Sequence, residues 1–435
     1  MSLDTLTAND APGVHAPSLY ADRRWPDPRP ALTGEADADV AIVGGGFTGC
    51  SAALQCAKRG MKAVVLEANR VGWGASGRNG GQLGTEQHRT QAEIEDWLGE
   101  AHARHLHALA VEANELVRGF VAERGIDAGL TEGILYVNHR KRFGEESRRH
   151  VERMRERYGV QSLRHVPPEA LREMLASDAF HDAILDMRAA HLNPMALVQG
   201  LADAAEGAGA TIHEQSRVTA VEEGRGVTVR TASGGTLRAR RLLFALNGYH
   251  GDLVPSLGRA VMPINNFVVA TEPLGEEQAN ALIKDRLAVC DSRFVVNYFR
   301  IDPDTRLIFG GAESYGMRFP KDIAKTVRPA LTRTFPQLRK VAITHAWGGT
   351  LGITRSRLPH FARISANVLT CGGYSGHGVG LATLGGKLAA EAFDGEPERF
   401  DVFARIPASR FPGGRRARGP LLAGAMVWYG LRDRV

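Results

Sequence analysis

The segment VAIVGGGFTG, residues 40–49, places Gly44, Gly46 and Gly49 in the spacing G-x-G-x-x-G. The apolar run before this turn predicts a buried strand, and the residues after it predict a helix. Such a helix directs its free N–H groups and the positive end of its dipole at the turn, where negative charge is stabilised. Glycine lets the backbone approach that charge closely. The segment therefore predicts a site for a phosphate group.

The residues that follow extend this pattern to a strand–helix–strand unit. The helix is predicted to run from about Thr48 to Arg59, Gly60 ends it, and residues 62–66 form the next strand. Glu67 directly after that strand can accept hydrogen bonds from ribose hydroxyls. The whole unit therefore predicts a dinucleotide site. The alternative is a glycine-rich turn in another kind of βαβ unit.

Length and composition bound the class of protein. With 435 residues the chain is long for one core, so we expect two domains. Its 43% hydrophobic and 23% charged residues are typical of a soluble globular protein. The formal net charge of +6 is small for this length, and no basic patch interleaved with aromatic residues occurs. We therefore expect no nucleic-acid partner.

The four cysteines, Cys50, Cys56, Cys290 and Cys371, are scattered and form no C-x-x-C pair. We expect neither a disulfide framework nor a metal site, and we expect Cys50 and Cys56 to pack in the first helix as small apolar groups. Residues 1–20 contain no apolar core of signal-peptide type, and no apolar run is long enough to span a bilayer. These features predict a cytoplasmic protein without an integral membrane span.

A second glycine turn lies near the C-terminal end of the chain. In GYSGHGVGLATLGGKLAAEAF, Gly373, Gly376, Gly378 and Gly380 precede a helix of small residues. The N-terminus of that helix would stabilise the negative charge that a reduced flavin carries at its pyrimidine edge. The alternative is tight packing of the helix against a sheet.

The loop GASGRNGGQ, residues 74–82, supplies polar side chains between glycines. Ser76, Arg78, Asn79 and Gln82 on a backbone that permits close approach would suit a diphosphate and a flavin ring. An exposed loop is the alternative. Further on, residues 91–125, 141–158 and 192–209 have helical spacing, and residues 260–315 contain several strand-like runs of a second sheet.

Together these motifs resemble those of the D-amino-acid-oxidase-type flavoproteins, and within that family those of the gamma-glutamylputrescine oxidoreductases. The resemblance extends roughly from Pro17 to the end of the chain. The segments that carry it are VAIVGGGFTG, LEANRVGWGASGRNGGQ, LNPMALVQGLADAA, NGYHGDLVP, FPQLRKVAITHAWGGTLGITRSRLPHFARI, GYSGHGV and FPGGRRARGPLLAGAMVWYGLRDRV. The first of these is common to FAD folds, and GASGRNGGQ, GYSGHGV and the tail are more specific.

The resemblance implies an α/β fold in which a Rossmann-like FAD-binding domain is interleaved with a second, mainly antiparallel-sheet α+β substrate domain. The implied segments are 1–34 (N-terminal arm), 35–90, 166–250 and 341–400 (FAD-binding domain), 91–165 (mostly helical substrate part), 251–340 (substrate domain) and 401–435 (C-terminal tail).

The resemblance also implies which residues contact FAD. Glu67 would hold the adenosine ribose, Arg70 would lie beside the adenosine, Val218 would meet the adenine, and residues 376–379 would meet the pyrimidine side of the flavin. The full implied set is Gly44, Gly46, Phe47, Thr48, Gly49, Glu67, Ala68, Arg70, Gly74, Ala75, Ser76, Arg78, Asn79, Gly80, Gly81, Gln82, Val218, Asn247, Gly248, Gly376, His377, Gly378 and Val379.

Three departures from related sarcosine oxidases bear on the chemistry. Those enzymes attach their flavin to a cysteine, whereas Trp347 and Gly348 stand at the matching place, which predicts non-covalent FAD. They use a lysine to activate oxygen, whereas the matching run RLIFGGA has none, which leaves the electron acceptor open. Arg355 stands where a non-basic residue is expected, and this change bears on the substrate.

The implied reaction is hydride transfer from the carbon next to an amine to flavin N5, followed by hydrolysis of the imine to an aldehyde or ketone. The implied substrate is gamma-glutamylputrescine or a similar amino-acid-like amine, with oxygen as acceptor and hydrogen peroxide as product. One alternative is an amino acid, pipecolate-type or opine dehydrogenase that reduces a quinone, its tail with Arg415, Arg416 and Arg418 touching an anionic membrane surface. Another is a flavin-binding protein without turnover.

Candidate substrate-facing residues come from several segments. They are Tyr298, Arg300, Trp347, Arg357, Tyr374 and His377, of which Tyr298, Trp347, Arg357 and His377 are the catalytic candidates. An arginine would pair with a substrate carboxylate, and its alternative is a surface or interdomain salt bridge. Trp347 and Tyr298 would wall the pocket or pack in the core. His377, between two glycines, would orient the flavin rather than move protons.

Overall fold

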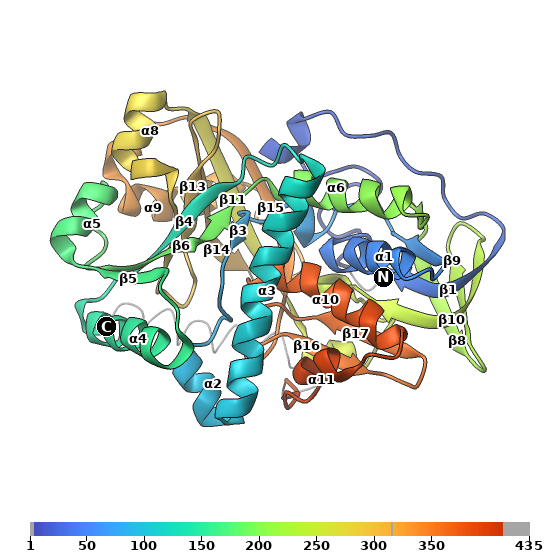
Figure 1. Ribbon diagram of the computed structural model, residues 1–435. Helices are drawn as coiled ribbons and strands as arrows, with labels where there is room; N and C mark the ends of the chain where they lie inside the picture. Colours follow the sequence, from blue (N-terminus) through green and yellow to red (C-terminus); the bar gives the residue numbers. More distant parts are fainter. Residues whose placement is uncertain (1–3, 315, 412–435) are drawn as a thin grey trace.

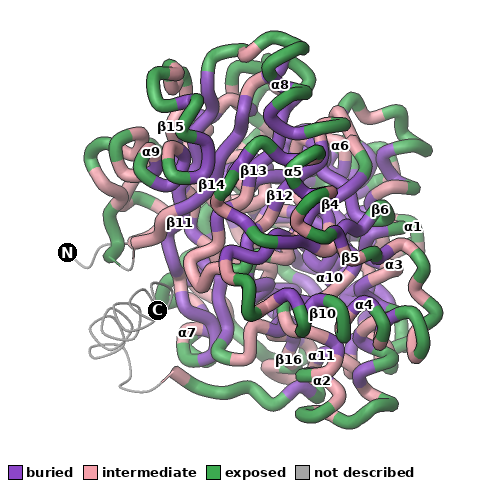
Figure 2. The backbone as a smooth tube through the Cα atoms, turned by 90° about the vertical axis from the view of Figure 1, so that its left-hand side faces the viewer, coloured by how far each residue is buried: buried purple, intermediate pink, exposed green. Residues whose placement is uncertain are grey.

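The structure is a computed structural model that describes residues 4–314 and 316–411. Two sheets stand side by side, each with helices packed against it (Figure 1). Most strands are buried in the interior, and the helices around them are largely exposed on their outer faces (Figure 2). Among the described residues, no helix has the length and apolar character needed to cross a membrane.

The first sheet has eight strands and is parallel at its centre. Its strand order is β16-β17-β10-β1-β2-β7, with β9 paired to β10 and β8 paired to β9. The strands are β1 (Glu35–Val43), β2 (Ala63–Leu66), β7 (Thr211–His213), β8 (Val218–Glu223), β9 (Val227–Thr231), β10 (Thr236–Phe244), β16 (His360–Arg363) and β17 (Val368–Gly372). The pairs of β1 with β2 and β10, of β2 with β7 and of β10 with β17 are parallel. Such a centre is buried on both faces, which explains its continuous apolar runs.

Helices cover one face of this sheet. They are α1 (Phe47–Lys58), α6 (Pro194–Gly207), α10 (Gly378–Phe393) and α11 (Glu398–Ala404), and α3 (Glu100–Arg124) packs on α10 and α11. In α6, Asn193 caps the first turn by accepting from the N–H groups of Met195 and Ala196, and Pro194 stands at the first helical position, where its missing N–H costs nothing. Cys50 and Cys56 are buried in α1, as predicted.

The second sheet has nine strands and is mainly antiparallel. Its strand order is β15-β11-β14-β13-β12-β4-β6-β3, with β5 paired to β6. The strands are β3 (Gln82–Leu83), β4 (Thr131–Val137), β5 (Leu163–Val166), β6 (Ala183–His191), β11 (Met262–Pro273), β12 (Ala288–Asp291), β13 (Tyr298–Ile301), β14 (Arg306–Ser314) and β15 (Ile343–Ile353). The other helices are α2 (Gln91–Leu98), α4 (Gly144–Tyr158), α5 (Pro168–Met174), α7 (Leu257–Ala260), α8 (Glu276–Leu282) and α9 (Ile323–Thr334).

The predicted fold class is confirmed, since a parallel-centred α/β sheet alternates along the chain with an antiparallel one. Strands β3, β6 and β15 fall inside the ranges predicted for the FAD-binding domain but pair within the nine-stranded sheet. An apolar run predicts that a strand forms, but its pairing partner comes from elsewhere in the chain. The domain bounds themselves stay a prediction.

Candidate functional site

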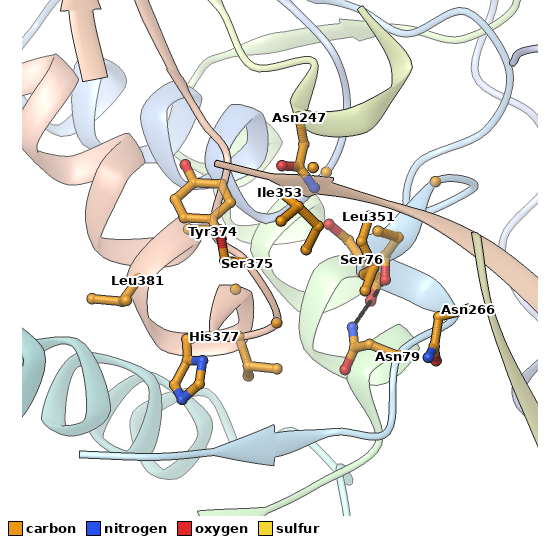
Figure 3. A pocket seen from close by; sticks show the side chains of 18 of the residues that line it. Ser76, Asn79, Asn247, Asn266, Leu351, Ile353, Tyr374, Ser375, His377 and Leu381 are labelled. Carbon is orange, nitrogen blue, oxygen red and sulfur yellow. Dashed lines mark hydrogen bonds between the residues drawn. The ribbon is translucent and has the colours of Figure 1, made fainter. Parts of the chain in front are cut away.

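Residues from both sheets line a cavity of about 1510 Å³. Its walls are the turn after β1, the loop that runs from Trp73 to Thr90, the start of α10, and side chains on β4, β12 and β13. In the view of Figure 3, Tyr374, Ser375 and His377 lie on one side of it, and Ser76, Asn79 and Asn266 lie on the other. Segments far apart in the sequence therefore meet at one enclosed site.

The first glycine turn forms one end of this cavity, and its glycines are required by packing. Gly44 has φ 112°, and a Cβ there would lie 2.6 Å from the carbonyl oxygen of Ala245. A Cβ on Gly49 would lie 1.8 Å from the carbonyl oxygen of Gly44. Helix α1 starts after Gly46, which supplies no side-chain cap, so the N-terminus of the helix opens toward the cavity.

Glu67 closes the same end from the tip of β2. Its Oε2 accepts a hydrogen bond from the N–H of Gly45 at 2.6 Å, and its Oε1 accepts from the N–H of Asn69 at 2.8 Å. Burial raises the pKa of this carboxyl to about 7. The two backbone donors offset only part of this effect of burial.

The second glycine turn leads from β17 into α10. His377 is the N-cap residue of α10 and makes no capping hydrogen bond with its side chain, so this helix also starts uncapped at the cavity. The two turns are tied together because the hydroxyls of Thr48 and Tyr374 are hydrogen-bonded at 2.6 Å. Asn247 anchors the turn by accepting from the N–H of Gly373 at 3.0 Å. Two helix N-termini thus converge on one cavity, which favours a ligand with negative charge.

Three residues other than glycine line the cavity with left-handed backbone. Asn247 has φ 45°, Arg357 has φ 63° and Ser375 has φ 51°. For side chains with a Cβ this conformation is costly, and it is maintained where surrounding structure imposes it, often at functional sites. The backbone is therefore held in special conformations around this cavity.

Most of the predicted site residues line the cavity. They are Gly44, Gly46, Phe47, Thr48, Glu67, Ala68, Gly74, Ala75, Ser76, Asn79, Gly80, Gln82, Val218, Asn247, Gly376, His377, Gly378 and Val379, together with Tyr298, Arg357 and Tyr374. The predicted residues that do not line it are Gly49, Arg70, Arg78, Gly81, Gly248, Arg300 and Trp347. Whether the lining residues bind FAD stays a prediction.

The three glycines outside the lining have a different reason to be glycine. A Cβ would lie 1.8 Å from the Gly44 carbonyl oxygen at Gly49, 1.9 Å from that of Leu192 at Gly81, and 2.6 Å from that of Leu351 at Gly248. Such distances are far below van der Waals contact, so these positions serve the close approach of backbone segments.

The arginines and the tryptophan outside the lining are held by protein partners. Arg70 donates from Nε to the buried carboxylate of Glu214 at 2.8 Å. Arg300, only 3% exposed, donates to the carbonyl of Gly80 at 2.7 Å. Trp347 is 1% exposed and donates to the carbonyl of Arg78 at 2.8 Å. None of these three side chains lines the cavity, and the substrate-facing role of Arg300 and Trp347 stays a prediction.

Arg78 and Arg355 also have protein partners and lie outside the cavity lining. Arg78 is buried, donates to Asp10 at 2.6 Å and to the carbonyl of Trp73 at 2.6 Å, and stacks 4.6 Å from the Trp73 ring. Arg355 donates to the carbonyl of Arg410 at 3.1 Å and does not line the cavity. The tail arginines Arg415, Arg416 and Arg418 lie outside the described residues.

Sequence reasoning missed a polar group on the far side of the cavity. Glu86 and His150 line it and form an ion pair, with Oε2 and Nε2 3.0 Å apart. The charge run that contains His150 predicts a solvated helix face, but α4 turns Ser147 and His150 toward the cavity. Because the partner lies in a loop 64 residues away, periodicity alone does not reveal this pair.

The N-terminal arm also contributes to the lining. Asp4, Thr5, Leu6 and Thr7 line the cavity, and Asp4 forms an ion pair with Arg217, the neighbour of Val218. Further along the arm, the N–H of Gly13 donates to Asn69 at 2.9 Å. The indole N–H of Trp73 donates to the carbonyl of Val14. The arm therefore covers the end of the cavity marked by Glu67.

Comparison with known proteins shows the family of this chain. The chain matches the family described as FAD dependent oxidoreductase over residues 39–392. It is 40% identical to gamma-glutamylputrescine oxidoreductase of Escherichia coli strain K12 over 91% of this chain and 93% of the relative. It is 42% identical to the probable oxidoreductase OrdL of Rhizobium meliloti over 93% of this chain and 94% of the relative.

Among solved structures, glycine oxidase from Geobacillus kaustophilus superposes with a TM-score of 0.74 at 22% identity and covers 87% of this chain and 100% of its own. At this identity the likeness shows the shared fold. The family match and the two relatives confirm the predicted resemblance. The chain belongs to the D-amino-acid-oxidase-type family of FAD-dependent oxidoreductases.

Proposed function

We propose that this protein oxidises gamma-glutamylputrescine or a similar amino-acid-like amine to an imine that hydrolyses to an aldehyde. The observation that carries the proposal is the 40% identity with gamma-glutamylputrescine oxidoreductase over nearly the whole of both chains. The cavity supports it, because residues of the parallel sheet and of the antiparallel sheet face one enclosed space. Such a space has room for a cofactor and for a substrate beside it.

The residues of the cavity fit FAD. Two uncapped helix N-termini and the close-approach glycine turn at Gly44 suit its diphosphate and its flavin edge. Glu67 would accept hydrogen bonds from ribose hydroxyls, and Ser76 and Asn79 would lie along the diphosphate and the flavin. When bound, FAD supplies a hydride acceptor, and the protein's part is to position the amine and exclude water.

We propose that the FAD is held without a covalent bond. Among the described residues, Cys290 is the cysteine that lines the cavity, and burial raises the pKa of its thiol to about 12. The thiol is therefore un-ionised at neutral pH and a poor nucleophile. Acid precipitation is expected to leave all yellow colour in the supernatant, and flavin that stays in the pellet would contradict non-covalent binding.

One experiment distinguishes the two candidate electron acceptors, oxygen and a quinone. We propose oxygen, and the competing candidate is a quinone, which is favoured by one observation: the described residues that line the cavity include no lysine. Purified holoenzyme with gamma-glutamylputrescine in air is expected to consume oxygen and release peroxide and ammonia in equal amounts. Turnover only when a soluble quinone is added would favour the dehydrogenase.

The affinity for FAD is expected to depend on pH through Glu67. Its carboxyl has a pKa of about 7, above the ordinary value of 4.5, and ribose hydroxyl donors would lower that pKa in the complex. FAD then displaces a proton, so the dissociation constant falls as pH rises toward 7, by at most about tenfold per pH unit, and levels off above it. The stability of the apoprotein depends on pH in the opposite direction. The contribution of Glu67 to the free energy of unfolding is lost as pH rises from 4.5 through 7, because its pKa is higher in the folded state.

Fluorescence titration of FAD into apoprotein between pH 5 and pH 8 measures this dependence. Glu67→Gln, which cannot ionise, is the matched control and is expected to bind FAD with a flat pH profile over the same range. A slope that persists in Glu67→Gln would assign the pH dependence to another group.

Removal of the N-terminal arm is expected to weaken FAD binding. Deleting residues 4–7, which line the cavity, opens its end next to Arg217 and Val218, so the dissociation constant is expected to rise about tenfold. Arg23→Ala, in the same arm, removes an exposed pair with Asp127 and a contact with the Trp25 ring, both outside the cavity lining, and serves as the control. Equal FAD affinity in the deletion variant and the wild type would show that the arm plays no part in retention.

A further inference from the structure

The side of the cavity remote from the first glycine turn carries opposite charges. Its lining includes the acidic Glu86 and the basic Arg357, which come from the loop before α2 and from the segment after β15. The loop of Glu86 reaches the second glycine turn, where His88 meets His377. The sequence predicts that Arg357 pairs with a substrate carboxylate, whereas Glu86 has no predicted role.

Glu86 presents a carboxylate whose charge is retained in spite of burial. Its Oε2 is 3.0 Å from Nε2 of His150, and this neighbour lowers the pKa of Glu86 while Glu86 raises the pKa of His150. The other oxygen, Oε1, has no hydrogen-bond partner within the described part of the chain. A buried acceptor without a donor is costly, so this position favours a ligand that supplies one.

Arg357 presents a guanidinium on a constrained backbone. It has φ 63°, a conformation that a residue with a Cβ adopts only under constraint, and its guanidinium carbon lies 5.1 Å from the centre of the Phe294 ring. Phe294 lines the cavity as well. An arginine stacked on an aromatic ring keeps its planar fork oriented, which suits bidentate binding of a carboxylate.

Two uncharged imidazoles lie near both groups. His88 and His377 meet edge to face with ring centres 5.3 Å apart, and burial lowers the pKa of each. Glu86 and Arg357 act on the pKa of His377 in opposite directions, and Arg357 also lowers that of His88. The segments that carry the two charged groups are in contact, because Arg89 donates from Nε to the carbonyl of Ser356, the neighbour of Arg357, at 2.6 Å.

We propose that Glu86 and Arg357 form a subsite for a zwitterionic amino acid head group, in which Glu86 binds the ammonium group and Arg357 binds the carboxylate. The inference rests on the proposed function and specifies its substrate class: amines that carry a free α-amino acid group. Glu86 and Arg357 would then determine specificity, while the positioning of FAD would depend on other residues. Putrescine itself, which has no carboxylate, would be a poor substrate.

Three amides of putrescine test the subsite in the holoenzyme. Gamma-glutamylputrescine carries both charged groups, glutarylputrescine lacks the α-amino group, and 4-aminobutyrylputrescine lacks the carboxylate. The rate of anaerobic flavin reduction, measured against amide concentration by stopped flow, gives an apparent dissociation constant for each. In the wild type we expect each deletion of a charged group to raise that constant about tenfold or more.

The variants assign each charge to one residue. Glu86→Gln is expected to weaken binding of gamma-glutamylputrescine about tenfold and to leave glutarylputrescine within about twofold of the wild type. Arg357→Gln is expected to weaken binding of gamma-glutamylputrescine about tenfold and to leave 4-aminobutyrylputrescine, which lacks the carboxylate, within about twofold of the wild type. Arg357→Lys should recover part of the loss. The controls are Glu152→Gln, an exposed carboxylate on α4, and Arg355→Gln, which does not line the cavity.

Two results would overturn the inference. If wild-type enzyme binds all three amides equally, no charged head group is recognised, whatever the variants do. If Glu86→Gln weakens the binding of all three amides equally, Glu86 has a structural role. His150→Gln is then expected to have the same effect, because it breaks the same ion pair. Flavin that none of the amides reduces would instead contradict the proposed function, which is a different outcome from a reduced flavin without discrimination.

Discussion

Gly49→Ala is expected to raise the dissociation constant for FAD by about one to two orders of magnitude and to lower thermal stability. The reason is steric, because the added Cβ would lie 1.8 Å from the carbonyl oxygen of Gly44, in the same turn. Neither atom belongs to a flexible side chain, so α1 must move away from the turn. Moving the helix also moves the N–H groups proposed to face the diphosphate.

The same substitution at Gly119 is the matched control. Gly119 lies within α3, is exposed, and has no atom within 4 Å of the place where a Cβ would stand. Alanine is the better helix former, so Gly119→Ala is expected to stabilise the protein by about 0.5–1 kcal/mol and to leave FAD affinity unchanged. Fluorescence titration with FAD and thermal unfolding measure both effects. Wild-type FAD affinity in Gly49→Ala would contradict the packing argument.

Glu214→Ala is expected to lower the free energy of unfolding by about 3–5 kcal/mol. The Glu214 carboxylate has no exposed surface and accepts hydrogen bonds from Arg70 at 2.8 Å and from the N–H groups of Arg29 at 2.9 Å and Val71 at 2.7 Å. Its removal leaves two backbone donors and the Arg70 guanidinium without their partner. The loss is large because buried donors and charges cannot turn to water.

Chemical denaturation followed by circular dichroism measures this effect. Glu222→Ala is the control, since it breaks an exposed ion pair with Arg230 at 3.2 Å and is expected to cost at most about 1 kcal/mol. Glu214 does not line the cavity, so the flavin content of folded Glu214→Ala should equal that of the wild type. A stability equal to that of Glu222→Ala would show that the buried pair contributes nothing.

Short-range signals in the sequence predicted the parts of the fold that depend on neighbouring residues. The spacing of Gly44, Gly46 and Gly49 with an apolar run before it predicted a strand, a turn and a helix, and α1 begins at Phe47, one residue from the predicted start. The helical spacing of residues 192–209 likewise predicted α6, which begins at Pro194. These elements follow from backbone conformation and capping, which a few adjacent residues determine.

The sequence did not reveal the contacts of side chains whose partners lie far along the chain. Arg70 was expected beside the adenosine, but its partner Glu214 stands 144 residues later in the chain. Trp347 is a catalytic candidate, and its buried ring packs edge-on against Tyr20, a residue of the N-terminal arm. His150 sits in a charge run typical of an exposed helix, yet Glu86 and the cavity determine its environment. A side chain's role in a site depends on contacts that periodicity does not encode.

Anaerobic reduction of the bound flavin tests the central claim most directly. Purified protein in an oxygen-free cuvette would be mixed with gamma-glutamylputrescine, and the visible absorbance of the flavin would be followed. Loss of the oxidised-flavin band within seconds, with putrescine alone much slower, is the result predicted for an amine oxidoreductase whose cavity accepts an amino-acid-like amine. An unchanged band over minutes at millimolar amide would contradict this substrate, although the FAD fold would stand.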